Sequence, residues 1–163
     1  MLHNIQFKKH FGQNFLRSEE HLENYINVIE PFENDLIIEI GPGDGAVTER
    51  LLKKGCKVVS IEVDTDLIPI LTEKFEFYTN FTLIQADVLE LDLVQLLSNY
   101  TDASSIKIVG ALPYNISKPI IRNVLELTKQ IEIKSINFII QKEVAEDYTT
   151  KPPRAQFLYN MSS

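Results

Sequence analysis

The fold is decided by residues 36–46, which read Leu36-Ile37-Ile38-Glu39-Ile40-Gly41-Pro42-Gly43-Asp44-Gly45-Ala46. The first five residues form a nearly continuous apolar run, which is typical of a strand buried on both faces of a parallel sheet. The glycines that follow permit a tight turn and a close approach of the backbone to a ligand. Helical spacing begins directly after them, so the stretch predicts a strand, a ligand-binding turn and the N-terminus of a helix.

Further β-type runs alternate with helical patterns along the rest of the chain, as in sheets built from βαβ units. The predicted strands cover residues 36–40, 57–61, 82–85, 106–109 and 136–140. The predicted helices cover residues 19–29, a short segment near 94–98, and apolar stripes at Val47, Leu51 and Leu52, at Leu67, Ile68, Leu71 and Phe75, and at Ile120, Ile121, Val124 and Leu125. These elements predict a Rossmann-like α/β fold, an open, doubly wound, mostly parallel sheet of five strands.

The last predicted helix has two start signals. Ser117 is a suitable N-cap, and Pro119 is tolerated in a first turn because no N–H is needed there. We therefore expect this helix to begin after Ser117.

Composition bounds the class of protein. The chain has 163 residues, of which 44% are hydrophobic and 24% charged, as in a globular domain. It holds no apolar run of about 18 residues, so we expect no membrane span. Cys56 is the single cysteine, which excludes an internal disulfide and a cysteine-based zinc site, and it reads as a small buried hydrophobe. We expect no metal and a reducing, cytoplasmic location.

The charge is unevenly distributed, although its net value of −7 argues against indiscriminate coating of nucleic acid. The first 17 residues contain Lys8, Lys9 and Arg17 and no acid, whereas all 23 Asp and Glu lie in the remainder. These three cations are candidates for contact with RNA phosphates. The alternative is three charges on a solvated terminus.

Two acidic residues close neighbouring predicted strands at the edge where ligands bind. Glu62 follows the second strand, where a carboxylate accepts both hydroxyls of a ribose, and Asp87 follows the third, where it could accept from an adenine amine. This pair supports an adenosine-containing cofactor. Each acid could instead be a solvated strand end or a helix cap, and the turn, taken alone, also permits a ligand-free role or a nicotinamide-dependent oxidoreductase.

Three further motifs carry a family resemblance. They are His10-Phe11-Gly12-Gln13-Asn14-Phe15-Leu16, then Gly110-Ala111-Leu112-Pro113-Tyr114-Asn115-Ile116-Ser117 after the fourth strand, and Gln141-Lys142-Glu143-Val144-Ala145 after the fifth. With the glycine turn, this set resembles the small-subunit ribosomal RNA adenine dimethyltransferases (the KsgA/RsmA family). The macrolide-resistance ribosomal RNA methyltransferases share most of the motifs.

The resemblance implies a fold, a cofactor and site residues. The fold is that of S-adenosylmethionine (SAM)-dependent methyltransferases, with residues 1–18 as a basic arm that covers the cofactor and 19–163 as the cofactor-binding domain. The implied SAM contacts are Asn14, Leu16, Gly41, Gly43, Glu62, Asp87 and Ala111. The implied catalytic loop is Ala111, Leu112, Pro113 and Tyr114, in which Tyr114 stacks on the flipped adenine and the Leu112 carbonyl accepts from its amine. The implied activity is N6-dimethylation of adjacent adenosines in small-subunit ribosomal RNA, a step of ribosome biogenesis.

Two departures from the family pattern leave a second function open. The family normally has Asn before Leu-Pro-Tyr, whose side-chain oxygen accepts from the target amine, and this chain has Ala111. Loss of one such hydrogen bond costs about 10²–10³ in rate. Family members also continue into further strands and a small helical domain, so we expect a sheet truncated after its fifth strand. The alternative to an enzyme is a catalytically weak or silent SAM- or RNA-binding module in ribosome assembly.

Overall fold

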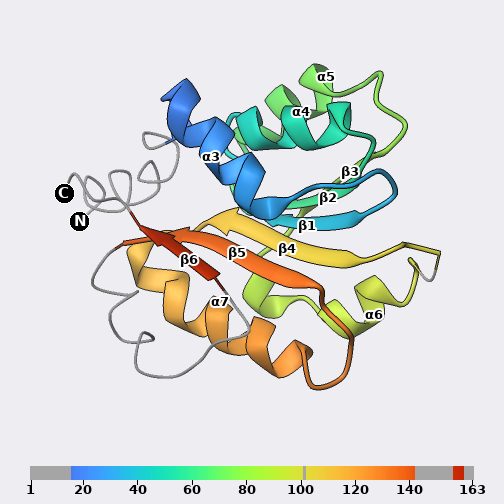
Figure 1. Cartoon of the computed structure of the whole chain (residues 1–163), viewed down its shortest axis with the longest axis vertical. Helices are drawn as coiled ribbons and strands as arrows, with labels where there is room; N and C mark the ends of the chain where they lie inside the picture. Colours follow the sequence, from blue (N-terminus) through green and yellow to red (C-terminus); the bar gives the residue numbers. More distant parts are fainter. Residues whose placement is uncertain (1–15, 101, 142–155, 160–163) are drawn as a thin grey trace.

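The computed structural model describes residues 16–100, 102–141 and 156–159, the last of these as backbone only. These residues form one six-stranded sheet in the order β3-β2-β1-β4-β5-β6, and every neighbouring pair is parallel (Figure 1). The strands are β1 Leu36–Ile40, β2 Lys57–Glu62, β3 Phe81–Gln85, β4 Ile106–Ala111, β5 Ser135–Ile140 and β6 Gln156–Tyr159. The helices are α3 Glu19–Ile29, α4 Ala46–Lys53, α5 Leu67–Lys74, the 3-10 turn η1 Val88–Glu90, α6 Leu93–Leu97 and α7 Tyr114–Leu127.

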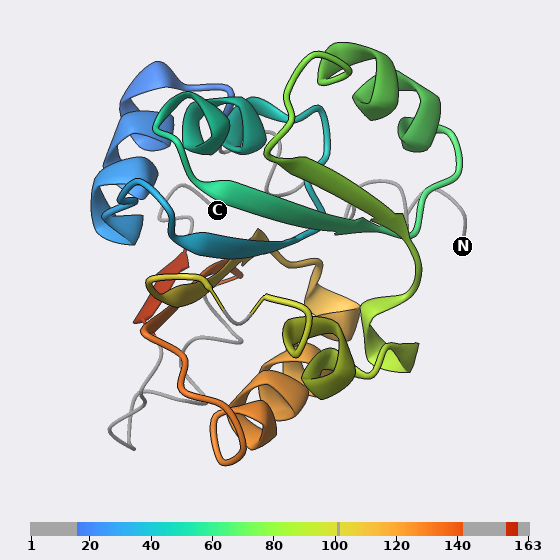
Figure 2. The same cartoon turned by 90° about the vertical axis from the view of Figure 1, so that its right-hand side faces the viewer.

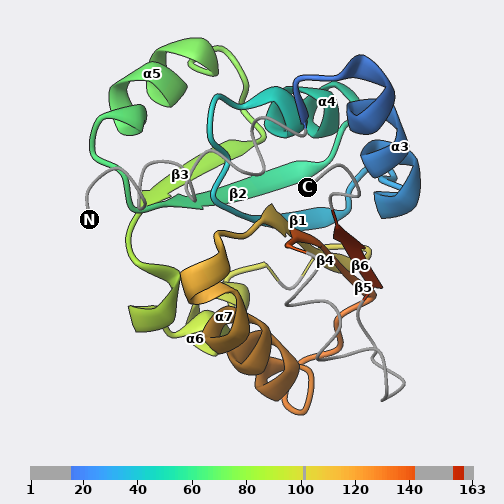
Figure 3. The same ribbon diagram turned by 90° about the vertical axis from the view of Figure 1, so that its left-hand side faces the viewer.

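The sheet lies between two layers of helices, as the predicted α/β fold requires. Helices α3, α4 and α5 cover one face, and α6 and α7 cover the other (Figures 2 and 3). Two apolar clusters fill the two interfaces, because successive strand residues point to opposite faces. On β1, for example, Ile38 packs toward α7 whereas Ile37 packs toward α3 and α4. Cys56 is fully buried in the cluster on the side of α3 and α4, as predicted.

The centre of the sheet depends on a close approach of β1 and β4. A Cβ atom on Gly110 would lie 2.5 Å from the carbonyl oxygen of Ile40, so only glycine fits there. The buried Tyr25 of α3 ties the same region to the helix layer, since its hydroxyl accepts from the Gly110 N–H (3.0 Å) and donates to the Asn137 carbonyl (2.6 Å). The carboxyl ends of β1 and β4 therefore lie side by side, and Tyr25 joins β4 and β5 to α3.

Two predictions about the second half of the chain are wrong. The sheet does not stop after five strands, because β6 pairs with β5 from Asn137↔Gln156 to Ile140↔Tyr159. Helix α7 begins at Tyr114 with Pro113 as its N-cap, so Ser117 and Pro119 lie inside the helix. The Ser117 hydroxyl donates back to the Pro113 carbonyl (2.6 Å) instead of capping. Among the described helices, none is long and apolar enough to cross a membrane.

Candidate functional site

A cavity of about 280 Å³ opens at the carboxyl ends of the central strands. It is lined by Ile40, Gly41, Gly43, Ile61, Glu62, Val63, Leu67, Ala86, Asp87, Val88, Ala111, Leu112, Pro113, Asn115, Ile116 and Ile120. These residues follow β1, β2, β3 and β4, so loops far apart in the sequence meet at one edge of the sheet. In an open α/β sheet this is the edge where ligands bind.

The glycine turn between β1 and α4 forms one wall of the cavity. The turn contains three glycines with positive φ, which are Gly41 (72°), Gly43 (59°) and Gly45 (87°). Residues other than glycine rarely adopt this backbone conformation. The Gly41 N–H donates to the Ile61 carbonyl (2.9 Å), which joins the turn to β2. A Cβ atom on Gly45 would lie 2.7 Å from the Phe75 ring, so the turn also packs closely on α5 and its C-cap.

A buried carboxyl lies behind this turn. Glu39 is 2% exposed, and its Oε1 accepts from the hydroxyls of Thr48 (2.5 Å) and Ser60 (2.8 Å). Burial raises the pKa of Glu39 from 4.5 to about 7, against the lowering effect of the two hydroxyls, and the nearby Glu62 carboxyl raises it further. Glu39 was not among the predicted site residues, although an acid inside an apolar strand was the available signal.

The two acids predicted to bind an adenosine both line the cavity. Glu62 is 5% exposed and its Oε2 accepts from the Asp64 N–H (2.8 Å). Asp87 is exposed, and its Oδ1 accepts from the Leu89 N–H (3.0 Å) as the N-cap of η1. The helix-cap alternative therefore holds for Asp87, and it is compatible with a ligand contact because the cap uses only one carboxylate oxygen.

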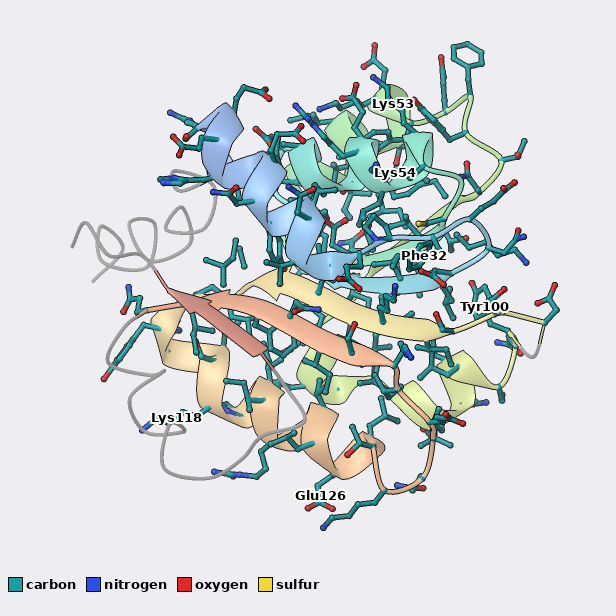
Figure 4. The ribbon with its side chains drawn as sticks, viewed as in Figure 1. Phe32, Lys53, Lys54, Tyr100, Lys118 and Glu126 are labelled. Atoms are coloured by element: carbon teal, nitrogen blue, oxygen red, sulfur yellow. The ribbon has the colours of Figure 1, made fainter. Side chains whose placement is uncertain are left out.

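The loop after β4 forms the opposite wall. Ala111 ends the strand, and the Leu112 N–H donates to the Ile139 carbonyl (2.9 Å), which fixes the loop to β5. Ala111, Leu112 and Pro113 line the cavity, whereas Tyr114 is 45% exposed and lies outside its lining. Helix α7 then leads away, with Lys118 near its start and Glu126 near its end (Figure 4).

The other predicted site residues lie elsewhere. Leu16 is partly buried and packs against the cluster between α3 and α4, so it does not line the cavity, and Arg17 is exposed. Lys8, Lys9 and Asn14 lie outside the described residues. The same is true of residues 142–145 in the motif after β5. Within the described ranges, no group of His, Cys, Asp and Glu could hold a metal ion.

Asn115, the second residue of α7, is a polar lining residue that was not among the predicted site residues. It lines the cavity beside Ala111 and Pro113. In the sequence, Asn115 stands four residues after Ala111. This spacing alone does not place it at the cavity, because its position depends on the start of α7 at Tyr114.

Comparison with curated proteins gives relatives that share one name. A protein of Clostridium botulinum (strain Langeland) named "Ribosomal RNA small subunit methyltransferase A" is 46% identical over 148 residues, which are 91% of this chain and 52% of that protein. A protein of the same name from Sulfurihydrogenibium sp. is 39% identical over 160 residues, covering 97% of this chain and 60% of that protein. The chain thus spans about half the length of the curated relatives it matches.

Solved structures agree on the fold. The 23S ribosomal RNA methyltransferase ErmE superposes with a TM-score of 0.68 at 27% identity, over 83% of this chain and 51% of that one. A dimethyladenosine transferase from Plasmodium falciparum gives a TM-score of 0.65 at 24% identity, over 79% of this chain and 44% of that one. The family model described as ribosomal RNA adenine dimethylase matches residues 4–156. With the site geometry, these matches show that the chain belongs to the ribosomal RNA adenine dimethylase family.

Proposed function

We propose that this chain is the SAM-binding part of a methyltransferase that dimethylates N6 of adjacent adenosines in a small-subunit ribosomal RNA loop. One observation carries the proposal: a single cavity unites the glycine turn, the carboxylates of Glu62 and Asp87, and residues 111–113, 115 and 116 at the junction of β4 and α7. The names of the relatives, which are ribosomal RNA small subunit methyltransferases, support this substrate class.

The residues that line the cavity fit SAM. The nearly buried Glu62 carboxylate suits the two ribose hydroxyls, and the Oδ2 of Asp87 is outside its cap bond and suits the adenine amine. Gly41 and Gly43 bring backbone without side chains to the methionine part. When bound, SAM supplies a methyl group on a positively charged sulfur. Asn14 belongs to the same proposed set, as a cofactor contact from the N-terminal arm, whereas Leu16 packs against the cluster between α3 and α4.

The loop after β4 positions the substrate. The adenine amine is a weak nucleophile because its lone pair is delocalised into the ring, and acceptors that bind its N–H groups help the nitrogen become tetrahedral. The Leu112 carbonyl is one such acceptor, and Pro113 fixes the loop with φ −62° and ψ 148°. The exposed ring of Tyr114 offers a stacking face for a base taken out of its stack. The apolar side chains of Ile116 and Ile120 exclude water.

The partner in this proposal is ribosomal RNA in an assembling small subunit in the cytoplasm. Lys8, Lys9 and Arg17 would lie near phosphates of a loop whose adenines can be splayed out. Deletion of residues 1–17 is expected to weaken RNA binding, and unchanged affinity would contradict the role of this arm.

A specific observation favours a second candidate, a silent SAM- or RNA-binding module. The side chain of Ala111 is a methyl group, so it cannot accept a hydrogen bond where the family normally places Asn. Such a module would bind SAM and transfer no methyl group.

Calorimetric titration of the purified chain with SAM tests the cofactor site, with NAD as the control ligand. Saturable binding of SAM that Glu62→Ala abolishes, and that the exposed-site variant Glu73→Ala retains, is the expected result. Methyl transfer to under-methylated small subunits then separates the two functions. Transfer by the natural chain supports the enzyme, whereas transfer only after Ala111→Asn identifies a silent module. A folded chain that does not bind SAM refutes the methyltransferase and the SAM-binding module, and leaves a module that binds RNA alone.

A further inference from the structure

We propose that the side-chain amide oxygen of Asn115 accepts a hydrogen bond from the N6 amine of the target adenine. It would take the role of the Asn that the family normally has where this chain has Ala111. This inference rests on the proposed function and concerns the same cavity. It assigns the missing acceptor to a different backbone position, on the first turn of α7.

The polar side chains that line the cavity point to Asn115. Of the side chains that line it, only those of Glu62, Asp87 and Asn115 are polar. The two carboxylates follow β2 and β3, on the side assigned to the cofactor. Asn115 is the single polar side chain contributed by the β4–α7 side, where the substrate amine must lie to meet the Leu112 carbonyl.

Among residues 16–100 and 102–141, the Asn115 side chain has no hydrogen-bond partner, and the residue is exposed. A side-chain amide carries one acceptor oxygen and two donor hydrogens, so the oxygen can be oriented toward an N–H group. An unpartnered amide at the wall of a largely apolar cavity is well suited to read a single polar group on a substrate.

The helix start holds Asn115 in a fixed position. The Pro113 carbonyl accepts from the Ile116 N–H (3.3 Å) and from the Ser117 hydroxyl (2.6 Å). Ile120, one turn further on, is 1% exposed in the core. A functional side chain on a packed helix is placed more accurately than one on a loop.

Two acceptors then bind the two amine hydrogens, the Leu112 carbonyl and the Asn115 amide oxygen. As the nitrogen lone pair forms a bond to the methyl carbon, the electron pair of the breaking C–S bond stays with sulfur. The methylated nitrogen is briefly an ammonium and gives one proton to water. Both acceptors stabilise the positive charge that develops on the N–H groups, which are fully bound only when the nitrogen is tetrahedral.

Binding of RNA tests this assignment without the methyl transfer step. We would measure the affinity of the 163-residue chain for a short single-stranded RNA that carries one adenosine, and for the same RNA with purine riboside, which lacks only the amine. The natural chain is expected to prefer adenosine by about fivefold to a hundredfold, the range of two hydrogen bonds. Because the Leu112 carbonyl still binds one amine hydrogen, Asn115→Ala should lower this preference by about threefold to tenfold. Asn123→Ala, an exposed asparagine on the same helix, should retain it.

Transfer to under-methylated small subunits provides the second arm. Asn115→Ala is expected to lower the rate by about 10²–10³ while SAM affinity is unchanged. Adding Ala111→Asn to this variant should restore the rate, because the acceptor returns at the other position. If Asn115→Ala keeps both the preference for adenosine and the rate of methyl transfer, the role of Asn115 is overturned and the proposed function is not. No transfer by the natural chain would overturn the proposed enzymatic function, and SAM binding would still be measured separately.

Discussion

The buried carboxyl of Glu39 makes the stability of this chain depend on pH in an unusual direction. Burial raises its pKa from 4.5 to about 7, which corresponds to about 3 kcal/mol at about 1.4 kcal/mol per pKa unit. The folded state therefore prefers the protonated acid, and its stabilising contribution is complete below pH 4.5 and lost as the pH rises through about 7. From pH 5 to pH 8 we expect the free-energy cost of this group to the natural chain to rise by about 2–3 kcal/mol.

The substitution Glu39→Gln keeps the shape, the acceptor for Thr48 and Ser60, and neutrality at every pH. Urea unfolding followed by far-ultraviolet circular dichroism suits a chain without tryptophan. The difference in unfolding free energy between the variant and the natural chain should increase by about 2–3 kcal/mol from pH 5 to pH 8. Glu73→Gln, at an exposed position of α5, is the matched control and should gain little. An equal effect of Glu39→Gln at pH 5 and pH 8 would refute the reasoning, because it would mean that the carboxyl is ionised throughout.

Three further substitutions test the contacts that position the site, all by urea unfolding at pH 7. Gly110→Ala should cost about 1–3 kcal/mol, because its Cβ would lie 2.5 Å from the Ile40 carbonyl; a neutral effect would contradict the close strand approach. Tyr25→Phe removes two buried hydrogen bonds between α3 and the sheet and should cost about 1–3 kcal/mol, so a change below the error of the measurement would argue against these bonds. Lys107→Met strands the buried Asp35 carboxylate 2.8 Å away and should cost about 3–5 kcal/mol; a more stable variant would show that apolar packing compensates.

Strands β1, β2, β4 and β5 could be predicted from the sequence because most of their residues are buried on both faces. The apolar runs predicted for β1 to β5 have ends within two residues of the strands, and the 19–29 prediction matches α3. The glycine turn and the two strand-end acids were likewise readable, since their position in a βαβ unit places them at one sheet edge. Local pattern and tertiary burial agree at these positions.

The sequence did not predict features that depend on distant partners. Strand β6 is only four residues long, and its pairing partner is the edge of β5. The start of α7 was missed because Ser117 looked like a cap, whereas its hydroxyl bonds back to Pro113 within the helix. The environment of Glu39 requires Thr48 and Ser60, which come from α4 and β2. No local spacing rule encodes these three contacts.

The strand order has a consequence for synthesis of the chain. β1 sits between β2 and β4, and its register with β4 runs from Leu36↔Ile106 to Ile40↔Gly110. At roughly 5–20 residues per second, β4 leaves the ribosome about 3–13 s after β1. During that interval β1 can pair with β2, but its other edge stays open and its five apolar-rich residues can pair with a foreign strand. The chain is therefore exposed to aggregation while β1 waits for β4, so slower translation between residues 41 and 105 should lower the yield of folded chain.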